Sequence, residues 1–144
     1  MPKKDKKPAY FTEEQEMFKV FVYGTLKSGG SIRGLENFGD GAVIVGRAKT
    51  TYPDYHMVDL GAFPGVLMGG TKHIQGEVWE VSDDVAEQLD AIEGYPEFYN
   101  KVPTETSQGK AMMYFLPKEY AKYPGPEQSQ QIDDEADTLT WIDG

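Results

Sequence analysis

A glutamate at the end of an expected helix is the first candidate for chemistry. Glu93 ends the run LDAIE, precedes Gly94, and is followed by the aromatic stretch YPEFY. Carbonyl groups at a helix C-terminus and a nearby apolar cover both disfavour an ionised carboxylate, so they favour proton uptake near neutral pH. A group tuned in this way suits general acid–base catalysis. An exposed glutamate at a helix end fits the pattern equally well, and Asp90 either repels Glu93 or caps local backbone.

The second candidate is the loop YGTL at residues 23–26, which directly follows the apolar run FKVFV. A strand that ends in a glycine-containing loop presents main-chain N–H groups, and these can hold a carboxylate or a developing oxyanion. An ordinary turn explains the same residues. The loop is not a phosphate-binding loop, because Gly30-Ser31 stands where Lys-Ser or Lys-Thr is needed. The glycines of residues 39–46 also have the wrong spacing for a dinucleotide fingerprint.

Composition excludes several other kinds of site. The 144 residues include no Cys, which excludes a disulfide framework, a thiolate metal site and a cysteine nucleophile. His56 and His73 have no partners at metal-ligand spacing, so we expect neither a metal nor a cofactor. No apolar run approaches the ~18 residues that cross a bilayer. The lysine-rich start lacks the apolar stretch of a secretory signal. We therefore expect a cytoplasmic protein with no membrane partner.

Charge is distributed unevenly along the chain. With 14 basic and 24 acidic residues the formal net charge is −10, and residues 127–144 carry six acidic residues and no basic one. A globally acidic surface repels a phosphate backbone, so no nucleic-acid partner is expected. The length fits one domain. We expect it over residues 17–126, between a flexible lysine-rich extension (1–16) and an acidic, partly disordered tail (127–144).

One helix and several short strands must position the two candidates. Ser82 is a good N-cap, Val85, Leu89 and Ile92 share one helical face, and Gly94 is the expected stop. Short apolar and aromatic runs predict strands over residues 18–23, 42–47, 55–60, 63–68, 74–81, 99–106 and 111–116. A single helix among short strands indicates an α+β domain, in which a curled sheet or barrel carries the helix on one side.

Two motifs together resemble the gamma-glutamylcyclotransferase-like family, most closely its gamma-glutamylamine cyclotransferase branch. VFVYGTLKSG and GEVWEVSDDVAEQLDAIEGYPEFYNK occur in the family's order, within a resemblance from about residue 18 to about residue 116. It implies a small mixed β-barrel flanked by helices around one cavity. Relatives often carry arginine at the position of Lys101, so a bidentate substrate contact would be lost here. The resemblance assigns catalysis to Glu93 and substrate binding to Tyr23, Gly24, Thr25, Leu26, Tyr99 and Tyr114.

The implied reaction needs neither a metal nor water. A γ-glutamyl compound carries its own nucleophile, the α-amine, and its own electrophile, the γ-carbonyl. Closing the five-membered ring gives 5-oxoproline and expels an amine, with Glu93 as the proton acceptor and donor. The expected partner is therefore a small-molecule γ-glutamyl substrate, bound by a monomer or weak dimer. Two alternatives stay open: a non-catalytic domain that binds a small molecule in the same pocket, and a sugar- or nucleotide-directed enzyme.

Overall fold

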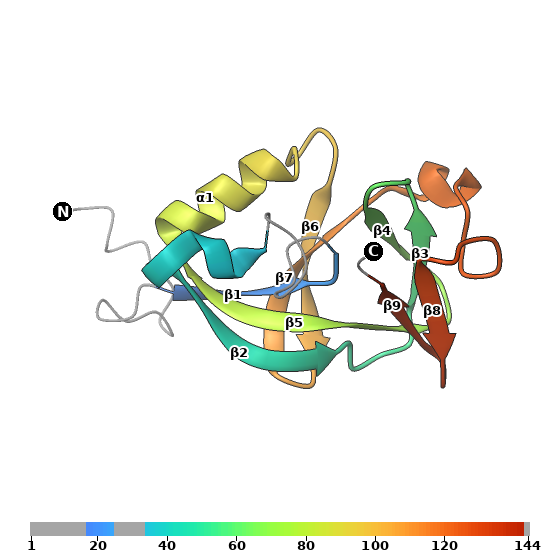
Figure 1. Ribbon diagram of the computed structural model, residues 1–144, viewed down its shortest axis with the longest axis horizontal. Helices are drawn as coiled ribbons and strands as arrows, with labels where there is room; N and C mark the ends of the chain where they lie inside the picture. The colour runs from blue at the N-terminus through green and yellow to red at the C-terminus, as the bar shows by residue number, and fades with distance from the viewer. Residues whose placement is uncertain (1–16, 25–33, 143–144) are drawn as a thin grey trace.

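A curved mixed sheet forms the frame of the protein (Figure 1). The computed structural model describes residues 17–24 and 34–142. The elements are, in chain order, β1 (Met17–Val22), the 3-10 helix η2 (Leu35–Gly41), β2 (Ala42–Lys49), β3 (Tyr55–Asp59), β4 (Pro64–Met68), β5 (His73–Ser82), α1 (Asp83–Ile92), β6 (Asn100–Thr106), β7 (Gly109–Phe115), the 3-10 helix η3 (Lys118–Lys122), β8 (Ile132–Glu135) and β9 (Thr138–Trp141).

The main sheet is curled, so that the ends of β2 and β6 lie close together. Its order is β6-β7-β1-β5-β9-β8, and β2 pairs with the other edge of β5. The pairs β1–β7 and β5–β9 are parallel, and the other pairs are antiparallel. The chain just beyond β2 closes onto the end of β6, through the bridge between Thr50 and Thr106 and a 2.9 Å hydrogen bond from Thr51 N to Glu105 O. This partly closed mixed barrel confirms the predicted α+β fold class.

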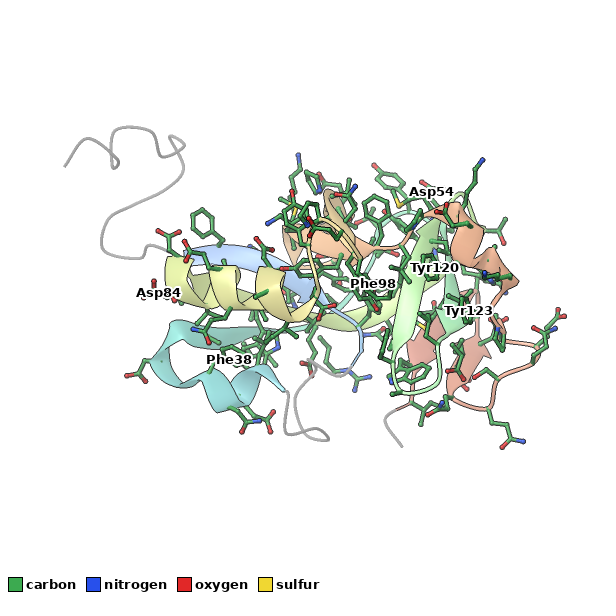
Figure 2. The ribbon with its side chains drawn as sticks, turned by 90° about the horizontal axis from the view of Figure 1, so that it is seen from above. Phe38, Asp54, Asp84, Phe98, Tyr120 and Tyr123 are labelled. Atoms are coloured by element: carbon green, nitrogen blue, oxygen red, sulfur yellow. The ribbon has the colours of Figure 1, made fainter. Side chains whose placement is uncertain are left out.

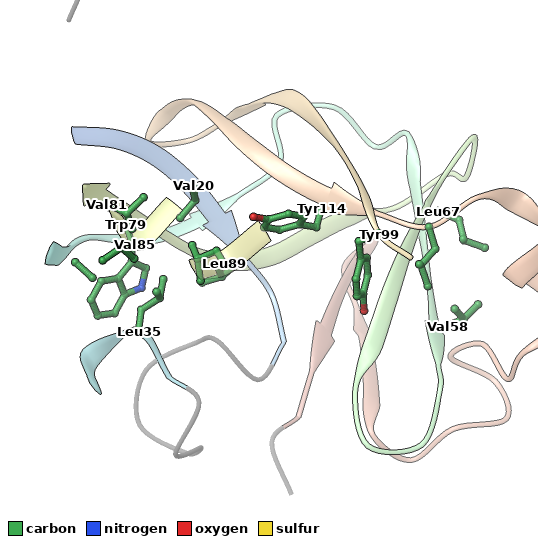
Figure 3. Packing of buried hydrophobic residues seen from close by; sticks show 13 residues of the cluster. Val20, Leu35, Val58, Leu67, Trp79, Val81, Val85, Leu89, Tyr99 and Tyr114 are labelled. Atoms are coloured by element: carbon green, nitrogen blue, oxygen red, sulfur yellow. The ribbon is translucent and has the colours of Figure 1, made fainter. Parts of the chain in front are cut away.

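Helix α1 covers one face of the sheet and begins and ends where the sequence predicts. The Ser82 side chain accepts a hydrogen bond from Val85 N at 3.2 Å, and two aspartates occupy the first turn. Val85 and Leu89, four residues apart, are buried against Trp79 of β5 in the cluster drawn in Figure 3. Burial of this apolar stripe fixes the helix on the sheet, so the position of its C-terminal end is fixed as well.

The hairpin of β3 and β4 packs beside the main sheet rather than within it. It forms its own two-stranded sheet and joins the chain after β7 through a 2.9 Å hydrogen bond from Leu116 N to Val66 O. A second apolar cluster, which includes Phe21, Met57 and Met113, lies between the hairpin and the sheet. The start of β4 is thereby held close to the end of β1, where the glycine loop begins.

The acidic C-terminal segment is part of the fold, so the expectation of a tail over residues 127–144 is wrong for its described part. Residues 132–141 form the β8–β9 hairpin, and β9 pairs with His73 and Ile74 at the start of β5. Ile132, Leu139 and Trp141 are buried, while the acidic side chains of β8 point to solvent. The high acidic content of this segment therefore belongs to exposed positions of a folded strand. The extension predicted over residues 1–16 lies outside the described residues.

In the part of the chain that the structure covers, no helix combines the length and the apolar character that a membrane span requires.

The buried hairpin predicts a stability difference between two aliphatic truncations. Leu139 is fully buried, so Leu139→Ala should lower the free energy of unfolding by about 2–5 kcal/mol. The matched control is Ile142→Ala, which truncates a side chain that is 47% exposed and should change stability by no more than about 0.5 kcal/mol. Urea unfolding measures both values. Equal effects of the two substitutions would contradict the packing of this hairpin into the core.

Candidate active site

A cavity of about 150 Å³ lies where the ends of α1 and β1 meet the starts of β4 and β6. It brings together Glu93 and Gly24, the two candidates that are 69 residues apart in the chain. Most of its lining is aromatic or aliphatic, with Glu93 as the one carboxylate among the described lining residues. The lining consists of Phe21, Val22, Tyr23, Gly24, Phe63, Pro64, Ile92, Glu93, Phe98, Tyr99 and Tyr114.

The backbone at the end of α1 holds Glu93 in place. Gly94 adopts φ +66°, and its N–H donates to Ala91 O at 3.2 Å, while Tyr95 N donates to Asp90 O at 2.9 Å. These two bonds form a Schellman motif, in which glycine takes the left-handed conformation just past the helix. Glu93 is the C-cap residue, and its carbonyl oxygen accepts from Tyr99 N at 3.3 Å. The glutamate is thus tied to the helix on one side and to the approach to β6 on the other.

Gly24 allows the end of β1 to approach the start of β4. A Cβ atom at this position would lie 2.9 Å from two ring carbons of Pro64, closer than a side chain tolerates. The Pro64 carbonyl accepts a hydrogen bond from the Tyr99 hydroxyl, so the same residue is also held from β6. The main chain at Gly24 therefore faces the cavity without a side chain in between. Thr25 and Leu26, which the sequence assigns to the same loop, lie outside the described residues.

The three predicted tyrosines line the cavity, but their hydroxyls bind other parts of the protein. The Tyr23 hydroxyl donates to Tyr114 O at 2.8 Å and accepts from Val66 N at 3.3 Å. The Tyr114 hydroxyl donates to Asp90 Oδ1 at 2.6 Å. Burial, aided by the negative charge of Glu93, raises the pKa of Tyr23 well above its usual value of 10. Burial, followed by the hydrogen bond and charge of Asp90, likewise raises the pKa of Tyr114.

Aromatic rings in edge-to-face contact build one wall of the cavity. Phe98 contacts Phe63 at 6.1 Å, Tyr99 at 5.0 Å and Tyr120 at 5.7 Å between ring centroids. Phe98 and Tyr120 are labelled in Figure 2. The sequence names Phe98 only as apolar cover for Glu93, and Phe63 belongs to no motif. Such rings are found through the tertiary structure, because they come from three separate segments of the chain.

Lys101 pairs with Asp90 and is not part of the cavity lining. Its Nζ atom lies 3.0 and 2.9 Å from the two carboxylate oxygens of Asp90 and 4.3 Å from the centre of the Tyr95 ring. The sequence suggests that Asp90 either repels Glu93 or caps local backbone, and its contacts in the structure fit neither role. Its side chain neither caps the helix nor stands as an uncompensated neighbour of Glu93, because a lysine and a tyrosine hydroxyl bind it.

A second hollow lies on another face, between β2, β5 and the β8–β9 hairpin. It is a wide groove of about 760 Å³ that is lined by polar residues such as Arg47, Lys49, Asp133 and Glu135. None of the predicted site residues lines it. Within residues 17–24 and 34–142, no three His, Asp or Glu side chains converge as a metal site. The described residues with candidate catalytic and binding roles meet at the smaller, aromatic cavity.

Comparisons with known proteins identify the family of this chain. Residues 20–140 match the family model described as gamma-glutamyl cyclotransferase, AIG2-like, so the match includes most of the C-terminal hairpin. A gamma-glutamylcyclotransferase homologue of Vibrio cholerae is 38% identical over 95 residues, which cover 66% of this chain and 78% of that protein. A homologue of Methanocaldococcus jannaschii is 31% identical over 105 residues, which cover 69% of this chain and 84% of that protein.

Solved structures with the same fold support the match. The crystal structure of an AIG2-like protein from Mus musculus has a TM-score of 0.64 and 24% identity, covering 81% of this chain and 90% of that chain. An uncharacterized protein from Pyrococcus horikoshii has a TM-score of 0.57 and 26% identity, covering 69% of this chain and 77% of that chain. At 24% identity, the likeness to the Mus musculus protein concerns the fold alone. With a family match over most of its length, this chain belongs to the gamma-glutamyl cyclotransferase, AIG2-like family.

Proposed function

We propose that the protein converts a γ-glutamyl amine or γ-glutamyl amino acid to 5-oxoproline and the free amine, with Glu93 as the general acid and base. The observation that carries the proposal is the meeting of the Glu93 carboxylate and the main chain of Gly24 in one aromatic cavity. Family membership supports a cyclotransferase. The choice of substrate and the role of Glu93 are the parts that the experiments below test.

The reaction is an intramolecular acyl transfer in which the substrate supplies both the nucleophile and the electrophile. A bond forms between the α-nitrogen and the γ-carbonyl carbon, and the bond from that carbon to the leaving nitrogen breaks. The α-ammonium nitrogen loses two protons as it becomes the lactam N–H. The leaving nitrogen takes up both, one as its bond to the carbonyl carbon breaks and one as the free amine becomes an ammonium ion near neutral pH. Holding the chain in its folded conformer can contribute roughly 7–11 kcal/mol in favourable intramolecular cases. The aromatic walls of the cavity support this role because they restrict the conformers of a bound chain.

Glu93 is the group in the cavity that suits the proton transfer. Tyr23 and Tyr114 have raised pKa values, so both hydroxyls keep their protons at neutral pH and donate them to protein acceptors. A carboxylate has no proton of its own at neutral pH and can accept one from a bound ammonium group, and a positioned general base contributes about 10²–10⁴-fold to the rate. In the proposed reaction Glu93 takes a proton from the α-ammonium group and returns it to the departing amine.

The main chain at Gly24 is the proposed place for the developing negative charge. Backbone N–H groups stabilise an oxyanion well when no side chain stands between them and the substrate. The close packing of Pro64 against Gly24 supports a fixed loop geometry at this point. The proposal extends this role to Thr25 and Leu26 from the family resemblance, and it assigns the rings of Tyr23, Tyr99 and Tyr114 to contact with the bound substrate.

The central prediction concerns Glu93→Gln. The amide keeps the size of the side chain but accepts a proton poorly, so kcat for 5-oxoproline release should fall about 10²–10⁴-fold. The assay uses a panel of γ-glutamyl amines and γ-glutamyl amino acids, with product quantified by chromatography. Glu97→Gln makes the same chemical change at an exposed position on the same connection and should retain wild-type rates.

Each outcome of this assay decides between the candidate functions. Product from the wild type and its loss in Glu93→Gln alone would support the proposal, and the preferred panel member would identify the leaving amine. Equal rates in both proteins would overturn the assignment of Glu93 as the base. Binding of panel members without product from the wild type would overturn the enzyme and favour the alternative, a binding domain that keeps the cavity.

A separate prediction follows from the raised pKa of Tyr23. The folded-state pKa lies above the unfolded value of 10, so this tyrosine stabilises the fold fully below pH 10 and progressively less as the pH rises beyond it. Between pH 10 and about pH 11.5, the free energy of unfolding of Tyr23→Phe should therefore fall less steeply than that of the wild type, by up to about 1.4 kcal/mol per pH unit. Tyr52→Phe, at a position that is 56% exposed, is the control. Parallel slopes for all three proteins would contradict the buried state of the Tyr23 hydroxyl.

A further inference from the structure

Asp90 is the centre of a small polar network that lies behind the wall of the cavity. Its carboxylate accepts the Tyr114 hydroxyl at 2.6 Å and pairs with Lys101 Nζ at 2.9 and 3.0 Å. Tyr114 lines the cavity, whereas Asp90 and Lys101 do not. The network therefore connects a residue of the cavity wall with two charged residues that have no place among the lining residues.

Sheet register explains why these residues meet. Lys101 of β6 and Tyr114 of β7 are direct partners in an antiparallel pair, so their side chains leave the sheet on the same face. That face is the one that α1 covers, and Figure 3 shows the Tyr114 hydroxyl directed toward the helix. Asp90 occupies the last turn of α1 and reaches both partners at once. The arrangement places one lysine, one aspartate and one tyrosine from three elements in mutual contact.

The network lies next to Glu93. Asp90 and Glu93 are three residues apart on α1, so they are neighbours on the helix surface, and like charges at this spacing repel. The last turn of α1 contains no basic residue of its own. Lys101 therefore brings a positive charge from β6 to the turn that carries both carboxylates. The side chains of Lys101 and Asp90 are only 26% and 28% exposed, so solvent screens their charges incompletely.

Among the described residues that line the cavity, the ionisable groups besides Glu93 are tyrosines. Tyr23 extends from β1, Tyr99 precedes β6 and Tyr114 belongs to β7, and all three line the cavity with Glu93. Burial raises the pKa of both Tyr23 and Tyr114, and the charge of Glu93 adds to the rise in each case. Tyr95, under the Lys101 ammonium group, is a fourth tyrosine but does not line the cavity. Among the described residues of these elements, Asp90 and Lys101 thus form the charged pair beside Glu93.

We propose that Asp90 and Lys101 are positioning residues for proton transfer by Glu93, an inference that rests on the proposed function. Asp90 holds the Tyr114 hydroxyl so that its ring forms a fixed part of the cavity wall. Lys101 cancels the charge of Asp90 and thereby keeps Glu93 ready to act as a carboxylate near neutral pH. Sequence analysis expects Lys101 to weaken a substrate contact. Its contacts in the structure are instead with Asp90 and Tyr95.

Three variants separate charge from packing. Lys101→Met leaves Asp90 uncompensated, so protonation of Glu93 should occur at a pH higher by roughly 0.5–1 unit. Asp90→Asn removes the negative charge next to Glu93, so protonation of Glu93 should occur at a lower pH than in the wild type. The double variant Asp90→Asn/Lys101→Met removes both charges and should return the midpoint to within about 0.3 pH unit of the wild type. Opposite shifts from two changes in one contact are not expected from a general loosening of the fold.

Two readouts keep the inference distinct from the proposed function. Carbon NMR of side-chain-labelled glutamate gives the protonation midpoint of Glu93 without any substrate, and the signal lost in Glu93→Gln assigns it. The pH profile of kcat for 5-oxoproline release gives the same midpoint during turnover. Lys101→Arg keeps the positive charge and should retain both profiles. Lys110→Met is the matched control, since Lys110 pairs with the exposed Glu105 on the same two strands.

Unchanged midpoints in Lys101→Met and Asp90→Asn would overturn the inference whatever the activity. An equal shift in Lys110→Met would also overturn it, because the effect would then come from net charge alone. If the NMR midpoints shift as expected but no panel member gives 5-oxoproline, the proposed function fails while the charge balance at Glu93 stands. Shifted midpoints in both readouts support the assignment of Asp90 and Lys101 to proton transfer.

Discussion

The turn that ends α1 is the constraint on which the site depends. Its two backbone hydrogen bonds require the left-handed conformation of Gly94, and they leave Glu93 at the C-cap with its carbonyl bound to Tyr99 N. Because Leu89 is buried four residues earlier, the helix cannot slide or rotate to carry Glu93 elsewhere without exposing an apolar side chain. A capping motif and one apolar stripe therefore set the position of the proposed catalytic group.

The rest of the cavity is built around this fixed point by contacts that cross the chain. Pro64 packs against Gly24 and accepts the Tyr99 hydroxyl, so it connects the ends of β1, β4 and β6. Tyr23 and Tyr114 direct their hydroxyls into the protein and leave their rings as walls. Polar atoms thus stabilise the frame, while the space between them stays mostly apolar. In the proposed reaction, such a cavity strengthens the interaction of the Glu93 carboxylate with a charged substrate group.

Local signals made α1 and most of the sheet predictable from the sequence. Ser82, the apolar spacing of Val85 and Leu89, and Gly94 each act within a few residues, so a single segment contains all the information for the helix and its end. The same holds for strands β1 to β7, including the β6–β7 hairpin. Glu93, Gly24 and the three tyrosines came from this local pattern together with the family resemblance, and the structure places all five in one cavity.

Long-range partners were the part that the sequence could not predict. The β8–β9 hairpin was not predicted because β8 consists mainly of acidic residues and only its Ile132 is buried. Leu139 and Trp141 are buried because β9 pairs with β5, which is far away in the chain. From the sequence, Lys101 is interpreted only as the replacement of an arginine that contacts substrate in relatives. Its cross-strand partner Tyr114 and its ion-pair partner Asp90 depend on register and on where the helix ends, so they were not predicted.

The most direct measurement of the central claim is a crystal structure with a γ-glutamyl analogue in which CHOH replaces the γ-carbonyl and CH₂ replaces the leaving nitrogen, so that no electrophile is left for the α-amine to attack. The account predicts that its α-amine lies about 2.6–3.2 Å from a Glu93 carboxylate oxygen, with its γ-hydroxyl next to the main chain at Gly24. An analogue bound in the groove between β2 and the β8–β9 hairpin, or one whose α-amine points away from Glu93, would contradict it.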